Sequence, residues 1–292
     1  MEFVDVSVLQ CAKENEGCMF QAASNFNGVE CISEGSTPDT PGFTSSYLYD
    51  HTQGPAASIS AGAAAVARVH AAFYDESKDP RTWGQTSGHQ VEMLEDVSEY
   101  FTVRNGYVCN TEENAPLPTD PAVLKEVENK VKVLVHANID AMYGRYDYNS
   151  ADYCQPQKIC QVFCAAMNLS QGFSGQRNRG LPGAGDKARL LLRAAYRGTL
   201  YGAEMYGCKK VYLTLIGGGV FGNNQDDIMH AICQAQAELC EFNKCIEEIH
   251  VVFFRAPYLD AVRRVLQQYP ANPWMTHVFS RGKAYITEKH DA

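Results

Sequence analysis

The sequence of 292 residues lacks long apolar runs, and no stretch approaches the ~18 consecutive apolar residues that a membrane-spanning helix needs. Its first residues, MEFVDVSVLQ, lack a basic region ahead of a long apolar stretch, so no secretory leader is expected. Positive charge is scarce as well, with 25 Lys and Arg against 34 Asp and Glu and a net charge of −9. We therefore expect a soluble cytoplasmic protein that binds neither nucleic acid nor membrane, and that holds any anionic ligand through backbone amides and helix ends.

The eleven cysteines include no C-x-x-C pair, and an odd number spread over a long chain is not typical of a secreted disulfide framework. The two tightest groups, Cys154/Cys160/Cys164 and Cys240/Cys245, lack histidines at metal-ligand spacing. Several cysteines lie in apolar segments such as VFCAAM. Free, reduced and mostly buried thiols are therefore expected, with no metal site and no cofactor.

Apolar patterns and turn residues predict strands that alternate with helices. The expected strands are residues 17–24, 132–136, 159–166, 210–216 and 249–254, and the expected helices are 55–74, 187–207 with Asp186 as its cap, 226–242 and 257–268. An Asn105-Gly106 turn between YFTV and YVCN predicts a hairpin. This alternation indicates a parallel sheet with helices on both faces, in one domain over 1–292 with an insertion at roughly 76–155.

The strongest functional signal is a strand that runs directly into the glycine-rich sequence GGGVFGNN and then into a helix. Glycines allow positive φ and close approach of a phosphate to main-chain N–H groups, and the dipole of the following helix favours an anion at the same place. The segment therefore predicts a diphosphate site formed by Gly217, Gly218, Gly219, Val220, Phe221, Gly222, Asn223 and Asn224. A tight strand–helix connection without a ligand is the structural alternative.

The same glycines satisfy the G-x-G-x-x-G fingerprint of dinucleotide-binding Rossmann domains. Two features count against that interpretation. The acidic residue expected about 20 residues on, at the end of the next strand, is replaced by Arg255 after VVFF, and little chain is left to build the sheet. An oxidoreductase that binds NADP stays as the alternative.

The order of strand, G-G-G-V-F-G, helix and strand near the end of an α/β chain resembles the second phosphate loop of macrodomains, which bind ADP-ribose. Q-A-A-S-N at 21–25 stands where macrodomains carry N-A-A-N beside the distal ribose, and D-H-T-Q-G-P-A-A-S at 50–58 is in the place of the first phosphate loop. The resemblance implies a three-layer α/β/α sandwich with a mixed, largely parallel central sheet and an inserted hairpin region.

With Q-A-A-S-N, T-Q-G-P-A-A-S and G-G-G-V-F-G-N together, the sequence is most similar to the MavL-like class of macrodomains, over most of its length. That class implies a hydrolase that removes mono-ADP-ribose from arginine side chains, with ADP-ribose and arginine-modified proteins as partners. A non-catalytic reader of ADP-ribosylated proteins would use the same loops. Besides the glycine loop, the residues implied to bind ADP-ribose are Ser24, Asn25, Gln53 and Gly54.

Cleavage of an N-glycosidic bond passes through oxocarbenium-like charge and needs a carboxylate to activate water or stabilise that charge. Asp226 and Asp227 follow the glycine loop, although carboxylates there also complement a helix N-terminus. Asp50 adjoins the other loop and is the second candidate, with a capping or turn role as its alternative. Glu30 and Asp39 lie in the polar segment 27–54 and rank lower.

Overall fold

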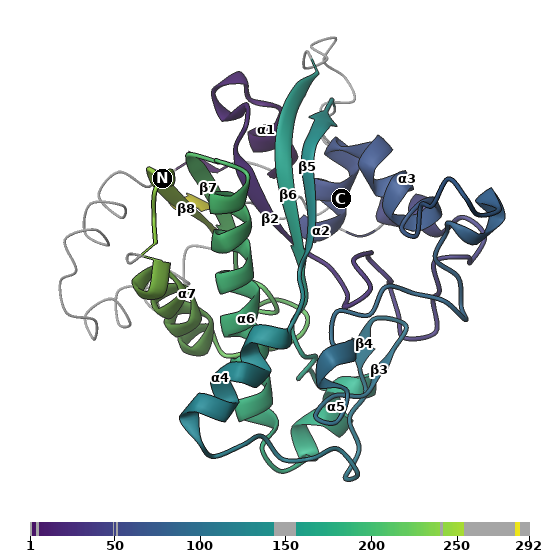
Figure 1. Ribbon diagram of the computed structural model, residues 1–292, viewed down its shortest axis with the longest axis vertical. Coiled ribbons are helices and arrows are strands. Elements are labelled where there is room, and N and C mark those ends of the chain that lie inside the picture. Colours follow the sequence, from purple (N-terminus) through teal and green to yellow (C-terminus); the bar gives the residue numbers. More distant parts are fainter. Residues whose placement is uncertain are drawn as a thin grey trace.

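The computed structural model describes residues 2–3, 6–48, 50, 52–142, 156–239, 242–253 and 284–286. Its central sheet has seven strands in the order β1-β9-β8-β7-β2-β6-β5 (Figure 1). The strands are β1 Glu2–Phe3, β2 Met19–Ala23, β5 Leu134–Ala141, β6 Gln157–Cys164, β7 Lys210–Thr214, β8 Glu248–Phe253 and β9 Ala284–Ile286. Neighbouring strands are parallel except β5, which runs antiparallel to β6, so the predicted mixed and largely parallel sheet is confirmed.

Helices cover both faces of this sheet, which confirms the α/β/α sandwich. In Figure 1, α6 (Ala184–Met205) and α7 (Gln225–Leu239) lie on one side of it and α1 (Val6–Cys11), α2 (Gln53–Ser60) and α3 (Gly62–His70) lie on the other. Side chains of β2 alternate between the two layers, because successive residues of a strand point to opposite faces. Met19 packs in the core beneath α6 and α7, and Phe20 packs in the core beneath α1 and α2.

The predicted helix over 55–74 is two helices, α2 and α3, and the prediction of one continuous helix is wrong. The backbone leaves the helical region at Ala61, with φ −116° and ψ 56°. The carbonyl oxygen of Ser60 accepts a hydrogen bond from the N–H of Met142 at 2.9 Å, and the Ser60 hydroxyl donates to the carbonyl of Ala57 at 2.9 Å. The N–H of Met142, just after β5, thus takes the place of the helical N–H group that would otherwise donate to the Ser60 carbonyl.

The inserted region contains the predicted hairpin. Strands β3 (Val103–Arg104) and β4 (Tyr107–Val108) are antiparallel, and both turn residues, Asn105 and Gly106, have positive φ of 47° and 79°. Positive φ at both central residues is typical of the tight turn that Asn-Gly favours. The short 3₁₀ helices of the fold are η1 Lys13–Asn15, η2 Phe43–Leu48, η3 Pro80–Thr82 and η4 Glu95–Val97.

Three helices lie where none was predicted, α1, α4 (Pro121–Lys130) and α5 (Phe173–Gly180). Asp120 caps α4 by accepting hydrogen bonds from the N–H groups of Ala122 and Val123, at 2.8 and 3.3 Å. An aspartate followed by proline is a readable start signal. Helix α5 has Gly172 at its N-cap and no side-chain cap, so it has no comparable signal.

Asp186 lies in the first turn of α6, which begins at Ala184 after Gly183, so its predicted role as the cap is wrong. The left-handed backbone of Gly183, with φ 72°, starts the helix three residues earlier than a side-chain cap at Asp186 would. Strands β1 and β9 were not predicted. The predicted helix over 257–268 and Arg255 lie outside the described residues.

Within the described part of the chain, no helix is long and apolar enough to cross a membrane. In that same part, no group of three or more His, Cys, Asp and Glu side chains is arranged to hold a metal ion. The described cysteines are free thiols: Cys11, Cys18, Cys31, Cys109, Cys160, Cys164, Cys208, Cys233 and Cys245.

Strand β5, at one of the two edges of the sheet, is irregular. Its pairing with β6 shifts register between His136 and Ile139. Asn138, inside this interval, has a positive φ of 55°. Such a bulge bends a strand and interrupts its ladder of hydrogen bonds.

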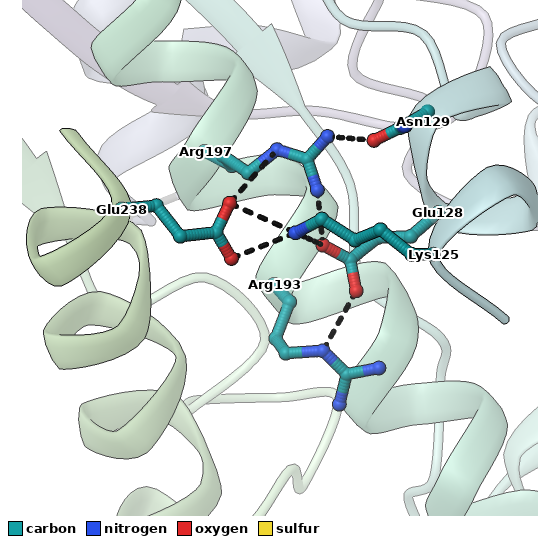
Figure 2. Close-up of polar contacts among 6 residues, drawn as sticks. All are labelled: Lys125, Glu128, Asn129, Arg193, Arg197 and Glu238. Atoms are coloured by element: carbon teal, nitrogen blue, oxygen red, sulfur yellow. Dashed lines mark hydrogen bonds and ion pairs between the residues drawn. The ribbon is translucent and has the colours of Figure 1, made fainter. Parts of the chain in front are cut away.

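A cluster of charged side chains ties α4 to α6 and α7 (Figure 2). Glu128 of α4, whose side chain is 4% exposed, accepts a hydrogen bond from Arg193 Nε at 2.8 Å and pairs with Arg197. Lys125 Nζ lies 3.3 Å from Glu128 Oε1 and 2.7 Å from Oε1 of Glu238 on α7. Burial acts to raise the pKa of Glu128, but the Arg193 hydrogen bond and the three cations outweigh it and hold the pKa below its usual range.

Replacing Glu128 with Gln is expected to lower the free energy of unfolding by about 1–3 kcal/mol, because a buried charged hydrogen bond is lost. Since the folded pKa lies below the unfolded value, this stabilisation is present above the unfolded pKa and disappears as the pH falls through the folded one. Urea unfolding between pH 7 and pH 3 measures both effects. Glu126→Gln, on the exposed side of α4, is the matched control, and an equal loss in both variants would contradict the prediction.

Candidate functional site

Three loops meet at one edge of the sheet because β2, β6 and β7 are parallel and their carboxyl ends point the same way. The N–H of Ser24, after β2, donates to the carbonyl of Cys164 at the end of β6, at 2.8 Å. The Asn223 side chain, in the loop after β7, donates through Nδ2 to the carbonyl of Met167 at 2.9 Å. The predicted ribose and phosphate segments therefore converge on the same edge.

Two of the four loop glycines are needed for the backbone itself. Gly217 and Gly222 have φ of 70° and 66°, a region that favours glycine. A Cβ on Gly217 would also lie 2.6 Å from Cβ of Ala166 and from Nδ2 of Asn223. Gly219, in contrast, has nothing within 4 Å of the position of its missing Cβ. The loop is thus tight at its ends and open at its centre.

Three successive amides at the centre of the loop have no protein acceptor among the described residues, those of Gly219, Val220 and Phe221. Two of the following amides are used inside the loop, where Gly222 N–H donates to the Gly219 carbonyl at 3.1 Å and Asn223 N–H donates to the Gly217 carbonyl at 2.9 Å. Successive open N–H groups ahead of a helix N-terminus form an anion-binding concavity. The centre of the loop therefore has the geometry that the predicted phosphate site requires.

The two asparagines that follow serve the loop and the helix. Asn224 Oδ1 accepts a hydrogen bond from the N–H of Asp226 at 2.8 Å, as a residue that caps α7 does. Asn223 holds the loop through Nδ2, while its buried Oδ1 has no partner in the described part of the chain. Asp227 lies 3.6 Å from Arg189 of α6, from Oδ2 to Nη1, so its carboxylate faces the neighbouring helix.

At the front of the site, Asn25 shapes the turn that carries Glu30. The side-chain Oδ1 of Asn25 accepts a hydrogen bond from the N–H of Cys31 at 2.7 Å. The backbone N–H of Asn25 donates to the carbonyl of Val29 at 2.9 Å. The Ser24 hydroxyl donates to the Asn25 carbonyl at 2.9 Å. Ser24 and Asn25, which are predicted to lie beside the ribose, are both buried.

The carboxylate of Glu30 packs against the first turn of α2. A Cβ on Gly54 would collide with Oε1 of Glu30 and with the carbonyl oxygen of Ala23, so this close approach requires glycine. Glu30 as a residue keeps part of its surface open to solvent. Burial of its carboxylate raises the pKa of Glu30 well above its usual range, the charge of Asp50 raises it further, and Arg68 opposes both.

Asp50 comes just before α2, and its Oδ1 accepts a hydrogen bond from the N–H of Thr52 at 2.9 Å. Glu30 and Asp50 therefore form an acidic pair at the N-terminal end of α2. Asp39 lies on the surface, bonded to the hydroxyls of Thr37 and Ser87. From the sequence alone, Glu30 ranks below Asp50, Asp226 and Asp227 as a catalytic candidate. No local sequence pattern shows that Glu30 lies against Gly54.

Aromatic rings link the glycine loop to this acidic pair. The ring centroids of Phe221 and Tyr107 are 5.8 Å apart, and the Tyr107 hydroxyl donates to the carbonyl of Cys31, next to Glu30. A hollow beside Gly54 is lined by Val6, Gln21, Ala22, Ala23, Gln53, Tyr212, Leu213, Thr214 and Val252. Gln53 Oε1 accepts from the Val6 N–H at 3.3 Å, which places the predicted ligand residue Gln53 at that hollow.

No protein-family model matches the chain, and no curated protein matches it. Among solved structures, the chain resembles the poly(ADP-ribose) glycohydrolase of Deinococcus radiodurans in complex with ADP-ribose, at 18% identity and a TM-score of 0.35, over 47% of this chain and 53% of that one. It also resembles the Oceanobacillus iheyensis macrodomain with MES bound, at 15% identity and a TM-score of 0.32, over 51% of this chain and 70% of that one. A Trypanosoma brucei macrodomain in complex with ADP matches at 13% identity and a TM-score of 0.28, over 50% of this chain and 52% of that one. The chain thus spans about half the length of the Deinococcus and Trypanosoma chains.

Gly54→Ala is expected to destabilise the fold by about 1–3 kcal/mol, because the added methyl group forces Glu30 and the Ala23 backbone away from α2. Gly62→Ala is the matched control, since nothing lies within 4 Å of a Cβ there. In that open position alanine should raise helix stability by roughly 0.5–1 kcal/mol. Urea unfolding of both variants checks the opposite signs, and equal effects would rule out the close packing of Glu30 on Gly54.

Gly219→Glu is expected to abolish binding of ADP-ribose while the fold is retained, because the site of the new side chain is open and its charge repels a diphosphate. Gly219→Gln has nearly the same bulk without the charge and should bind more weakly than the natural protein but far better than the Glu variant. Calorimetric titration with ADP-ribose measures this order. An unchanged affinity in Gly219→Glu would defeat the assignment of the loop.

Proposed function

We propose that this protein is a macrodomain-like hydrolase that removes mono-ADP-ribose from arginine side chains. The observation that carries the proposal is the acidic pair of Glu30 and Asp50, held at the same edge of the sheet as the three open amides of the glycine loop. An anion receptor and a carboxylate pair side by side suit a ligand with a diphosphate at one end and a cationic leaving group at the other.

The diphosphate would accept hydrogen bonds from the amides of Gly219, Val220 and Phe221. This mode of binding needs no cationic side chain, in keeping with the net charge of −9. The distal ribose would then lie over Ser24 and Asn25, with Phe221 beside it. The hollow next to Gln53 would take an apolar part of the ligand, because its walls include Val6, Ala23 and Val252.

Glu30 suits the role of the general base. A base works best when its pKa lies near the working pH, and burial together with Asp50 moves the pKa of Glu30 in that direction. The carboxylate takes a proton from water as the water oxygen bonds to C1″ of the ribose. The C1″–N bond breaks with its electron pair on the guanidine nitrogen, which takes up that proton, and Asp50 stabilises the oxocarbenium-like charge.

The charge of the segment around this pair supports a guanidinium as the leaving group. Residues 27–54 contain Glu30, Glu34, Asp39 and Asp50 and no Lys or Arg. Carboxylates bind the planar guanidinium through its fixed N–H donors. A glutamate-linked ADP-ribose is joined through a neutral ester and offers these carboxylates no such cation.

The test is a panel of peptides with ADP-ribose on arginine, glutamate or serine. We expect release of ADP-ribose from the arginine-linked peptide alone. Equal release from the glutamate-linked peptide would contradict the arginine assignment. Binding of ADP-ribose without turnover of any peptide would identify a reader instead of an enzyme.

The same assay separates the candidate carboxylates. Glu30→Gln and Asp50→Asn should each lower turnover by ~10²–10⁴-fold while product ADP-ribose still binds, because only the charge is removed. Asp226→Asn and Asp227→Asn are the comparison pair, and we expect each to keep most of its turnover. A collapse of turnover in either of them, with Glu30→Gln active, would move the catalytic role to α7.

A further inference from the structure

Arg68 of α3 is a buried cation beneath the acidic pair. It is 1% exposed, and its guanidinium carbon lies 3.6 Å from the centre of the Phe163 ring of β6. None of the ion pairs among the described residues includes Arg68. Burial lowers the pKa of Arg68 to about 10, with Tyr47 and Glu30 opposing that shift, so it stays charged at neutral pH. A buried charge without an ion-pair partner is costly, which calls for a role.

The guanidinium bridges the two segments that bring Glu30 and Gly54 together. Its Nε donates to the carbonyl of Gly28 at 3.1 Å, two residues before Glu30. Its Nη2 donates to the hydroxyl of Ser58 at 3.0 Å, one helical turn after Gly54 on α2. One rigid side chain therefore fixes the distance between the loop that carries the carboxylate and the helix that receives it.

Neighbouring side chains hold the fork in place. His136 Nδ1 lies 3.4 Å from Nη1, and burial together with the charge of Arg68 lowers the pKa of His136 to about 4, so the ring is neutral and accepts. Gln85 donates through Nε2 to the carbonyls of Asn27 and Arg68, at 3.0 and 2.9 Å. The loop is thus tied to α3 at two successive residues, 27 and 28.

We infer that Arg68 is a positioning residue, which clamps the Gly28–Glu30 segment to α2 and so holds the Glu30 carboxylate against Gly54. Its effect on turnover rests on the proposed function, but its effect on Glu30 itself does not. The charged and titratable groups that face this clamp are Glu30, Tyr47, Asp50 and His136.

Loss of the cation has a defined sign. Arg68 lowers the pKa of Glu30, so its removal raises that pKa further. Glu30 accepts a proton only when it is ionised, so the rise of activity with pH should move to higher pH. Loss of the clamp should also displace the carboxylate, and a shift of about 1 Å can cost up to about 100-fold in kcat.

The experiment follows the carboxyl carbon of Glu30 by NMR over a pH titration, in protein labelled with ¹³C-glutamate and assigned with Glu30→Gln. Arg68→Gln should titrate at higher pH than the natural protein, and its kcat on arginine-linked peptide should fall about 10- to 100-fold with little change in KM. Arg68→Lys keeps the charge without the fork, so its titration should lie near that of the natural protein while kcat still falls.

Arg197→Gln is the matched control, because it also removes a guanidinium with little exposure, 14%, the one that pairs with Glu128 (Figure 2). Arg197 belongs to α6, on the opposite face of the sheet from α3. It should lower the melting temperature and leave both the Glu30 titration and kcat unchanged. An unchanged Glu30 titration in Arg68→Gln would overturn the inference, even if no peptide is cleaved by the natural protein. If Arg68→Gln does not fold, Ser58→Ala removes one arm of the clamp, and an unchanged kcat and titration there would overturn it equally.

Discussion

The parallel pairing of β2 with both of its neighbours is the constraint on which the rest of the site depends. Met19 pairs with Cys160 of β6 on one side and with Val211 of β7 on the other. The loop after β2 is therefore flanked by the loops after β6 and β7, whatever their sequences. The hydrogen bonds of Ser24 and Asn223 to the carbonyls of Cys164 and Met167 then connect loops that the sheet already places side by side.

Around these three loops, neutral backbone amides and charged side chains occupy separate places. The backbone amides of Gly219, Val220 and Phe221 have no acceptor among the described residues, and this is where we propose that an anion binds. Carboxylates gather at the start of α2, and the cation that balances them, Arg68, is placed beneath them in the core. The acidic groups and the open amides thus lie in the loops, while the opposing positive charge of Arg68 is buried in the core.

Most strands of the sheet could be predicted from the sequence, because strands such as β7 and β8 are apolar runs bounded by turn residues. The hairpin turn could be predicted as well, because Asn105-Gly106 favours that turn by itself. The break between α2 and α3 at Ala61 could not be predicted. It depends on a hydrogen bond to the Ser60 carbonyl from the N–H of Met142, 82 residues later in the chain. The acidic partner of Asp50 was hidden for the same reason, since Glu30 matters through Gly54 and Arg68 and through no local pattern. The start of α4, in contrast, is signalled by an aspartate followed by proline at Asp120-Pro121, although no helix was predicted there.

The irregular edge of the sheet bears on how the protein behaves in a crowded solution. A straight outer strand offers an unbroken row of N–H and C=O groups to which another chain can add. In β5 the register shift between His136 and Ile139 and the left-handed Asn138 interrupt that row, and Asp140 and Lys158 place an ion pair near its end. The bulge therefore protects an otherwise exposed strand against edge-to-edge aggregation, a safeguard that a regular β5 would lack.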